Sequence, residues 1–179
     1  SCQVNGSGAN DPMNNASANA LAGTFGVSGV PTMYFGGTEM PFAAVGGGSA
    51  MQSTSVTRID EIIARTPIAN GKVSTTVNGN DITVKAETQF FKAVDATGGT
   101  YKIAAYITED GLSHTQSSDA SSNKNMHDNV LRTTLGASAT GDILTNQMDQ
   151  WGVKTFNFFG TLNAAWKKEK MKVVVVLWI

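Results

Sequence analysis

The hydrophobic pattern changes its period once along this chain, and that change constrains the fold more than any other feature. From Val56 to Ile63, apolar residues recur at helical spacing. From Lys72 onward, apolar and polar residues alternate, as they do on a strand with one buried face. We therefore expect two domains, a first one over residues 1–66 that contains helices and a second one over residues 67–179 built from antiparallel strands.

Turn residues divide the second domain into short strands. Asn78-Gly79 suits a type I′ hairpin turn, and the sequence alternates on both sides of it. Further apolar segments run over Tyr101–Thr108, Phe156–Phe159 and Met171–Ile179. Several short strands with regular turn signals predict a β-sandwich.

The first domain is expected to begin with a short helix over residues 12–22, because Asp11 suits an N-cap. A glycine-bracketed loop, 26–32, then leads into an apolar strand and a Gly-Gly turn. In the helix that follows, Glu61 is placed to pair with Arg65 four residues on. The order is thus helix, strand, turn and helix.

The balance of charge excludes one class of partner. Charged residues make up 15% of the chain, below the roughly 25% that is usual for soluble domains. The net charge is -1, so there is no excess of Lys or Arg to displace counterions from a phosphate backbone. We expect no binding to nucleic acid.

Cysteine and glycine usage argue against a cofactor. The single cysteine, Cys2, cannot form a C-x-x-C pair with any other residue here. The glycine-rich stretches 6–8 and 46–48 lack the lysine or the preceding strand of a nucleotide-binding loop. The longest apolar run, 173–179, is far shorter than the roughly 20 residues of a membrane helix. Because both ends look abrupt, we expect this sequence to be a piece of a longer chain.

Two groups of motifs resemble known families. The loop Gly26–Thr32 resembles the cis-proline segment of thioredoxin-like proteins. The segments Tyr106–Gly111 and His127–Arg132, with Gln116 between them, resemble the outer-membrane lipoprotein family of Bacteroidetes that is labelled by a mass of twenty-eight kilodaltons. Members of that family often carry Asn where Asp128 stands here.

The resemblance implies a fold and a location. It implies an α+β chain, in which the C-terminal part of a thioredoxin-like fold is followed by an antiparallel immunoglobulin-like β-sandwich. It also implies an outer-membrane location, with membrane contact only through a lipid anchor outside this chain. Val30, Pro31 and Thr32 are the candidates for the cis-proline segment.

Polar residues around the long Ser/Asn-rich loop are the first candidate site. Gln116, His127, Asn129 and Arg132 are expected to form a network that holds this loop, since buried amide and guanidinium groups need several partners. The alternative is that the same loop presents a ligand-binding surface.

A second candidate set consists of residue types that bind metals. Its members are Glu109, Asp110, His114, His127 and Asp128. Oxygen and imidazole donors of this kind can hold a cation, but their spacing matches no metal motif. We therefore expect no metal at these residues.

Three tryptophans could form an aromatic platform for a carbohydrate or a peptide, or could fill the space between two sheets. Trp166, beside two lysines, is expected to be the most exposed of them. Trp178, inside the last apolar run, is expected to lie between the sheets.

These observations favour a non-catalytic module of the cell envelope, used for binding an envelope protein or a surface ligand or for structural placement. The alternative is the remainder of an envelope thiol-disulfide oxidoreductase whose C-x-x-C half lies outside this sequence. A third possibility is assembly through an exposed strand edge, because Val173–Ile179 is continuously apolar.

Overall fold

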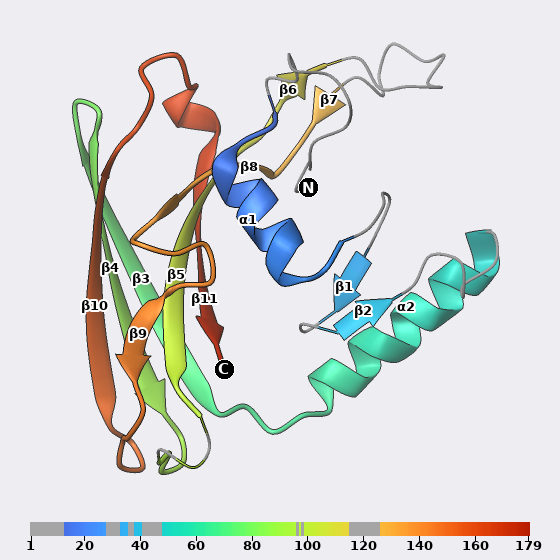
Figure 1. The fold of residues 1–179 in the computed structure, drawn as a ribbon, viewed down its shortest axis with the longest axis vertical. Helices are drawn as coiled ribbons and strands as arrows, with labels where there is room; N and C mark the ends of the chain where they lie inside the picture. The colour runs from blue at the N-terminus through green and yellow to red at the C-terminus, as the bar shows by residue number, and fades with distance from the viewer. Residues whose placement is uncertain are drawn as a thin grey trace.

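The computed structural model describes residues 13–27, 33–35, 38–40, 48–95, 97, 99–114 and 126–179. Helices and antiparallel strands make up these parts, which confirms the mixed α+β class (Figure 1). In chain order the elements are α1 (Ala16–Thr24), β1 (Met33–Phe35), β2 (Thr38–Met40), α2 (Gly48–Ile63), β3 (Ala69–Asn78), β4 (Asp81–Phe90), β5 (Tyr101–Glu109), β6 (Leu112–Ser113), β7 (Met126–His127), β8 (Val130–Leu135), β9 (Asp142–Thr145), β10 (Val153–Thr161), the 3₁₀ turn η4 (Lys168–Lys170) and β11 (Met171–Trp178).

Three strands form the first sheet, in the order β10-β4-β3. Its central strand, β4, follows the alternation predicted from the sequence. The buried side chains of β4 are those of Ile82, Val84, Ala86, Thr88 and Phe90. Because successive residues of a strand point to opposite faces, one face of this sheet rests on the core and the other faces solvent.

The predicted β3–β4 hairpin forms, but its turn differs from the expected one. Asn78 pairs with Asp81, so the two-residue loop is Gly79-Asn80 rather than Asn78-Gly79. Gly79 has a φ of +61°, whereas Asn80 is not among the residues with positive φ. A positive φ at the first loop residue alone matches a type II′ turn, so the predicted type I′ turn is wrong.

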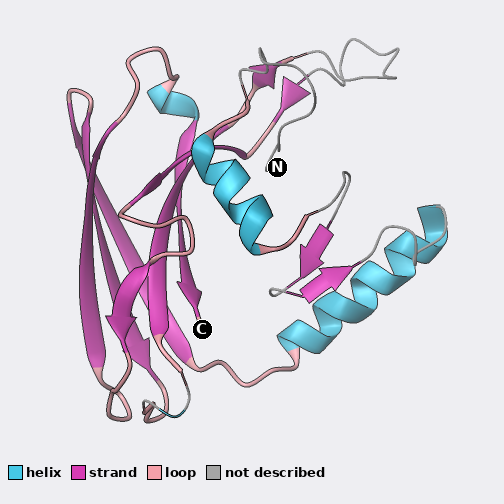
Figure 2. Cartoon of the chain, viewed as in Figure 1, coloured by secondary structure: helices cyan, strands magenta, loops and turns pink. Residues whose placement is uncertain are grey.

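The second sheet has the order β11-β5-β8, and β9 also pairs with β5. Its central strand, β5, is buried on both faces, since Lys102 is its one exposed residue. One face of β5 packs against the first sheet and the other against α1 (Figure 2). A strand enclosed in this way reads as a continuous apolar run rather than as an alternation.

The main core lies between the two sheets. It combines inward residues of β4, β5, β8 and β10 with Leu162, which follows β10. The buried members are Ile82, Val84, Ala86, Ile103, Ala105, Ile107, Leu135, Phe158 and Leu162. Since both sheets contribute, neither inner face would be covered without the other.

Helix α1 covers the outer face of the second sheet. Ala18 packs there with Ala104, Tyr106 and Leu131. Trp178 joins this cluster, and its Nε1 donates a hydrogen bond of 3.1 Å to the Tyr106 hydroxyl. The expectation that Trp178 lies between the sheets is therefore wrong, because even-numbered residues of β11 point toward α1 rather than toward the first sheet.

The start of α1 also differs from the predicted one. The N-cap is Asn15, whose side-chain oxygen accepts from the backbone N–H of Ala18 at 2.9 Å, and the helix runs from Ala16 to Thr24 rather than over 12–22. Asn15 Nδ2 in turn donates to the carbonyl oxygen of Leu131 at 2.5 Å. The hydroxyl of Ser17 accepts from the N–H of Thr134 at 3.0 Å. Side chains of α1 thus bind backbone groups along the outer edge of β8.

The remaining N-terminal elements are the β1–β2 pair and helix α2. Strands β1 and β2 are antiparallel, as the Gly-Gly turn predicted. On α2, Glu61 forms an ion pair of 2.6 Å with Arg58, three residues earlier, instead of the predicted pair with Arg65. Val56 and Ile63, on the helix, are exposed.

We expect Asn15→Ala to lower the free energy of unfolding by about 1–3 kcal/mol, because it removes both a helix cap and a partner of the β8 edge. The measurement is urea unfolding followed by circular dichroism. The matched control is Asn19→Ala, at an exposed position of the same helix, which should change stability by less than about 0.5 kcal/mol. Equal losses in the two variants would contradict the double role of Asn15.

Candidate functional site: a polar corner and an edge groove

Four of the candidate site residues lie outside the described residues. They are Val30, Pro31 and Thr32 of the candidate cis-proline segment, and Gln116 of the Ser/Asn-rich loop. Their roles therefore stay predictions. Most of the other candidates lie at the end of the second sheet where β5 ends, β8 begins and β11 begins, and this region is the polar corner. They are Glu109, Asp110, Asp128, Asn129 and Arg132.

An exchange of hydrogen bonds between two short turns forms the centre of the polar corner. Asp110 Oδ1 accepts from the backbone N–H of Asn129 at 2.8 Å. Asp128 Oδ1 accepts from the backbone N–H of Gly111, also at 2.8 Å. An Asn at position 128 could accept the same hydrogen bond, so the departure from the family pattern leaves this contact possible.

Lys172 links both turns to β11. Its Nζ lies 2.5 Å from Asp110 Oδ2 and 3.1 Å from Asn129 Oδ1. The ammonium group of Lys172 and the N–H of Asn129 hold the pKa of Asp110 below its ordinary value of 3.8. Asn129 adopts a φ of 55°, a left-handed conformation that Asn accepts more readily than most residues.

Arg132 belongs to a separate buried contact. Its Nε lies 3.2 Å from Glu109 Oε2, and Glu109 is only 2% exposed. The other oxygen of Glu109 accepts from the backbone N–H of Lys167 at 3.1 Å. The guanidinium carbon of Arg132 also lies 5.1 Å from the ring centroid of Trp166, close enough for a cation–π interaction.

A β-bulge explains why Arg132 reaches this place. Leu131 pairs with Thr108 and Thr133 pairs with Ile107, so Arg132 is an extra residue with no partner on β5. Bulges redirect side chains, and sequence spacing does not reveal where one occurs. Trp166 is half-buried beneath Arg132, and Trp151, 59% exposed, is the more exposed of the two, so the expected exposure of Trp166 is wrong.

His127 lies apart from both contacts. It sits on β7, paired with β6, and its Nε2 lies 3.3 Å from the carbonyl oxygen of His114. The predicted polar set is thus divided among three places: His127 near His114, Asn129 with Lys172, and Arg132 with Glu109. Within the described part of the chain, no three His, Cys, Asp or Glu side chains group as a metal site.

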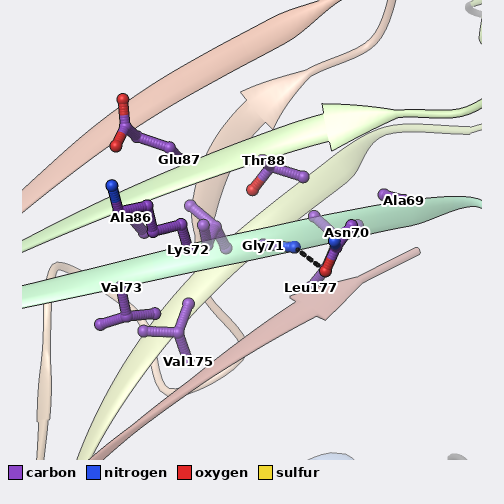
Figure 3. A pocket seen from close by; sticks show the side chains of 11 residues that line it. Ala69, Asn70, Gly71, Lys72, Val73, Ala86, Glu87, Thr88, Val175 and Leu177 are labelled. Atoms are coloured by element: carbon purple, nitrogen blue, oxygen red, sulfur yellow. Dashed lines mark hydrogen bonds between the residues drawn. The ribbon is translucent and has the colours of Figure 1, made fainter. Parts of the chain in front are cut away.

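The sequence did not predict a groove that opens between β3 and β11. It has a volume of about 280 Å³. Figure 3 shows Val73 from β3 and Val175 from β11 in the space between the two strands. The lining residues are Ala69, Asn70, Gly71, Lys72, Val73, Ala86, Glu87, Thr88, Ile103, Val175 and Leu177.

Both strands that flank the groove are edge strands. Among the described strands, β3 pairs only with β4, and β11 pairs only with β5. The N–H of Phe91 donates to the carbonyl oxygen of Ile68, and the N–H of Asp110 donates to that of Lys170. The first pair continues the β3–β4 ladder and the second continues the β5–β11 ladder. Since hydrogen-bonded pairs alternate in an antiparallel ladder, the odd-numbered residues of β3 and β11 direct their backbone groups to the open edges.

We expect Asp110→Asn to lower the melting temperature at neutral pH and to have little effect in strong acid. A carboxyl whose folded pKa is depressed contributes stability above its unfolded pKa, near 3.8, and that contribution is lost as pH falls through the folded pKa. The measurement is thermal unfolding of both proteins at a series of pH values. Asp60→Asn, at an exposed position of α2, is the control. A difference in melting temperature that stays constant with pH would contradict the assignment.

We expect Arg132→Met to destabilise the protein by about 3–5 kcal/mol, because it leaves the buried carboxylate of Glu109 without its cation. The double variant Glu109→Gln with Arg132→Met should lose less than the sum of the two single losses. Urea unfolding of all four proteins gives this cycle. Additive losses would show that the two side chains do not stabilise each other.

Comparisons with known proteins place this architecture. The family described as outer membrane protein Omp28 matches residues 18–178. Among solved structures, HBP35 of Porphyromonas gingivalis is similar, with a TM-score of 0.64 and 17% sequence identity over 88% of this chain. The chain spans 49% of that protein's length, and the likeness shows the fold alone.

A search of curated proteins found no match. In the described residues, no helix is both long enough and apolar enough to cross a membrane. The match covers most of the sequence, including both sheets and the polar corner. The chain therefore belongs to the Omp28 family of outer membrane proteins.

Proposed function

We propose that this chain is a non-catalytic binding module of the outer membrane, and that the groove between β3 and β11 binds polypeptide in an extended conformation. One observation carries the proposal: an apolar groove of about 280 Å³ lies between two strand edges whose backbone groups face outward. Strand addition to an open sheet edge is a common mode of peptide recognition. In that mode the backbone supplies affinity, and pockets for alternate side chains supply specificity.

The polar corner supports a non-catalytic role. Its carboxylates bind backbone N–H groups and neighbouring cations, in contacts that join β5, β8 and β11. Catalytic acids and bases usually lie in a cleft with room for a substrate. The side chains that β3 and β4 direct into the groove, by contrast, are apolar or uncharged.

We further propose the finer architecture that the resemblance implies. Residues 1–66 correspond to the C-terminal part of a thioredoxin-like fold, and residues 67–179 to an immunoglobulin-like sandwich. Two facing antiparallel sheets and the order α1, β1, β2, α2 support this division. A lipid anchor outside this chain would hold the module at the membrane. The redox alternative has no comparable support, since Cys2 and the cis-proline candidates lie outside the described residues.

The test is binding of a synthetic peptide of alternating Thr and Val residues, followed by amide hydrogen exchange. We expect the amides of Val173, Val175 and Leu177 to become protected when the peptide binds. The blocking variant is Gly71→Phe, because a Cβ at Gly71 meets only the carbonyl oxygen of Glu87, at an ordinary 3.7 Å, and the ring would fill the groove.

The matched control is Ser74→Phe, which adds the same ring to the opposite, solvent-facing side of β3. We expect this variant to bind the peptide as the unmodified chain does. Equal loss of binding in both variants would exclude the groove as the binding site. A peptide that protects no amide of β3 or β11 would overturn the proposed function.

A further inference from the structure

The two edges beside the groove are not equally available. On β3, the N–H of Gly71, which faces the open edge, already donates to the side-chain oxygen of Asn70 at 2.8 Å. Residues 173–177 of β11 carry no charged, polar or proline side chain, which are the usual devices that prevent strand pairing at an edge. A further strand therefore pairs more readily with β11 than with β3.

The inner face of β3 also indicates that a further strand lies beside β11. Val73 and Val77 have the same orientation as the buried residues Ala86 and Ile82, their partners on β4. Yet Val73 is 44% exposed and Val77 is 48% exposed, because the opposite sheet stops at β11. A strand added beside β11 would extend that sheet over these two valines.

We propose that the added strand is β11 of a second copy of this chain. A twofold axis would pair the two β11 strands antiparallel. The second sheets of the two copies would then form one continuous sheet. Each β11 would then lie over β3 of the other copy. This inference rests on the proposed function, since it names the partner of the same groove.

Charge and shape favour this occupant. Lys72 and Glu87, which are cross-strand partners of opposite sign, lie on the same outer face of the first sheet as Ser74. The side chains that β3 and β4 direct into the groove are therefore uncharged, and they suit an uncharged strand. Strand β11 carries a single charge, on Lys172, which pairs with Asp110. Pairing centred on Val174 or Val175 would place Lys172 opposite Val176 or Trp178 of the second copy, so no two lysines would meet. The alternate valines of β11 from the second copy would supply the apolar side chains that the groove accepts.

The experiment is sedimentation velocity of the whole chain from about 1 μM to about 1 mM. We expect a monomer–dimer equilibrium that Val175→Pro weakens at least about tenfold. Proline there removes an N–H at the open edge and leaves the ladder to β5 intact, as edge strands tolerate. The matched control, Val175→Ala, loses side-chain volume but keeps the N–H, so it should still form dimers.

Circular dichroism of each variant first establishes that it folds, and Gly71→Phe provides a second way to block the dimer if Val175→Pro does not fold. An unmodified chain that stays monomeric would overturn the second-copy proposal. If that monomer still binds the Thr/Val peptide, the proposed peptide-binding function stands without the second-copy proposal. A dimer that neither Val175→Pro nor Gly71→Phe weakens would place the interface elsewhere and also overturn the proposal.

Discussion

Burial of β5 on both faces is the constraint on which the rest of this structure depends. A strand with apolar residues on both sides needs two covering layers, and here β4 and β10 supply one while α1 supplies the other. The covering helix must lie across the second sheet, and this position brings Asn15 and Ser17 to the outer edge of β8. The enclosure of one strand thus determines where the helix sits and which edge it protects.

The edges of the two sheets are managed in different ways. Side chains of α1 bind the edge of β8, and Asn70 binds an outward N–H of β3. Among the described residues, no side chain protects the open edge of β11 in this way. The residues whose backbone groups face that edge carry apolar side chains. Such an edge is a site for pairing rather than a neutral surface, since unpaired backbone groups beside apolar side chains favour another strand.

Local patterns predicted the β3–β4 hairpin and segments of β5, β10 and β11, because alternation and turn residues are short-range signals. They did not predict β8 or β9, nor that Arg132 would reach Glu109 through a bulge, because these features depend on pairing with β5. Of the predicted polar set, Asn129 and Arg132 lie in the polar corner, but their partners were not foreseeable. Lys172 and Trp166, which bind Asn129 and Arg132, lie far along the chain.

The groove was beyond the reach of sequence reasoning for a related reason. A run such as Val173–Leu177 is typical of a strand buried on both faces. Its apolar character raised assembly through an exposed edge as one possibility, but it does not reveal which strand lies opposite that edge. The structure places Val176 beneath α1, and Val173 and Val175 against the shared core, while one side of the backbone stays open. An interior type of strand at an edge implies that a further strand completes the sheet, and the exposed inner valines of β3 mark where that strand lies.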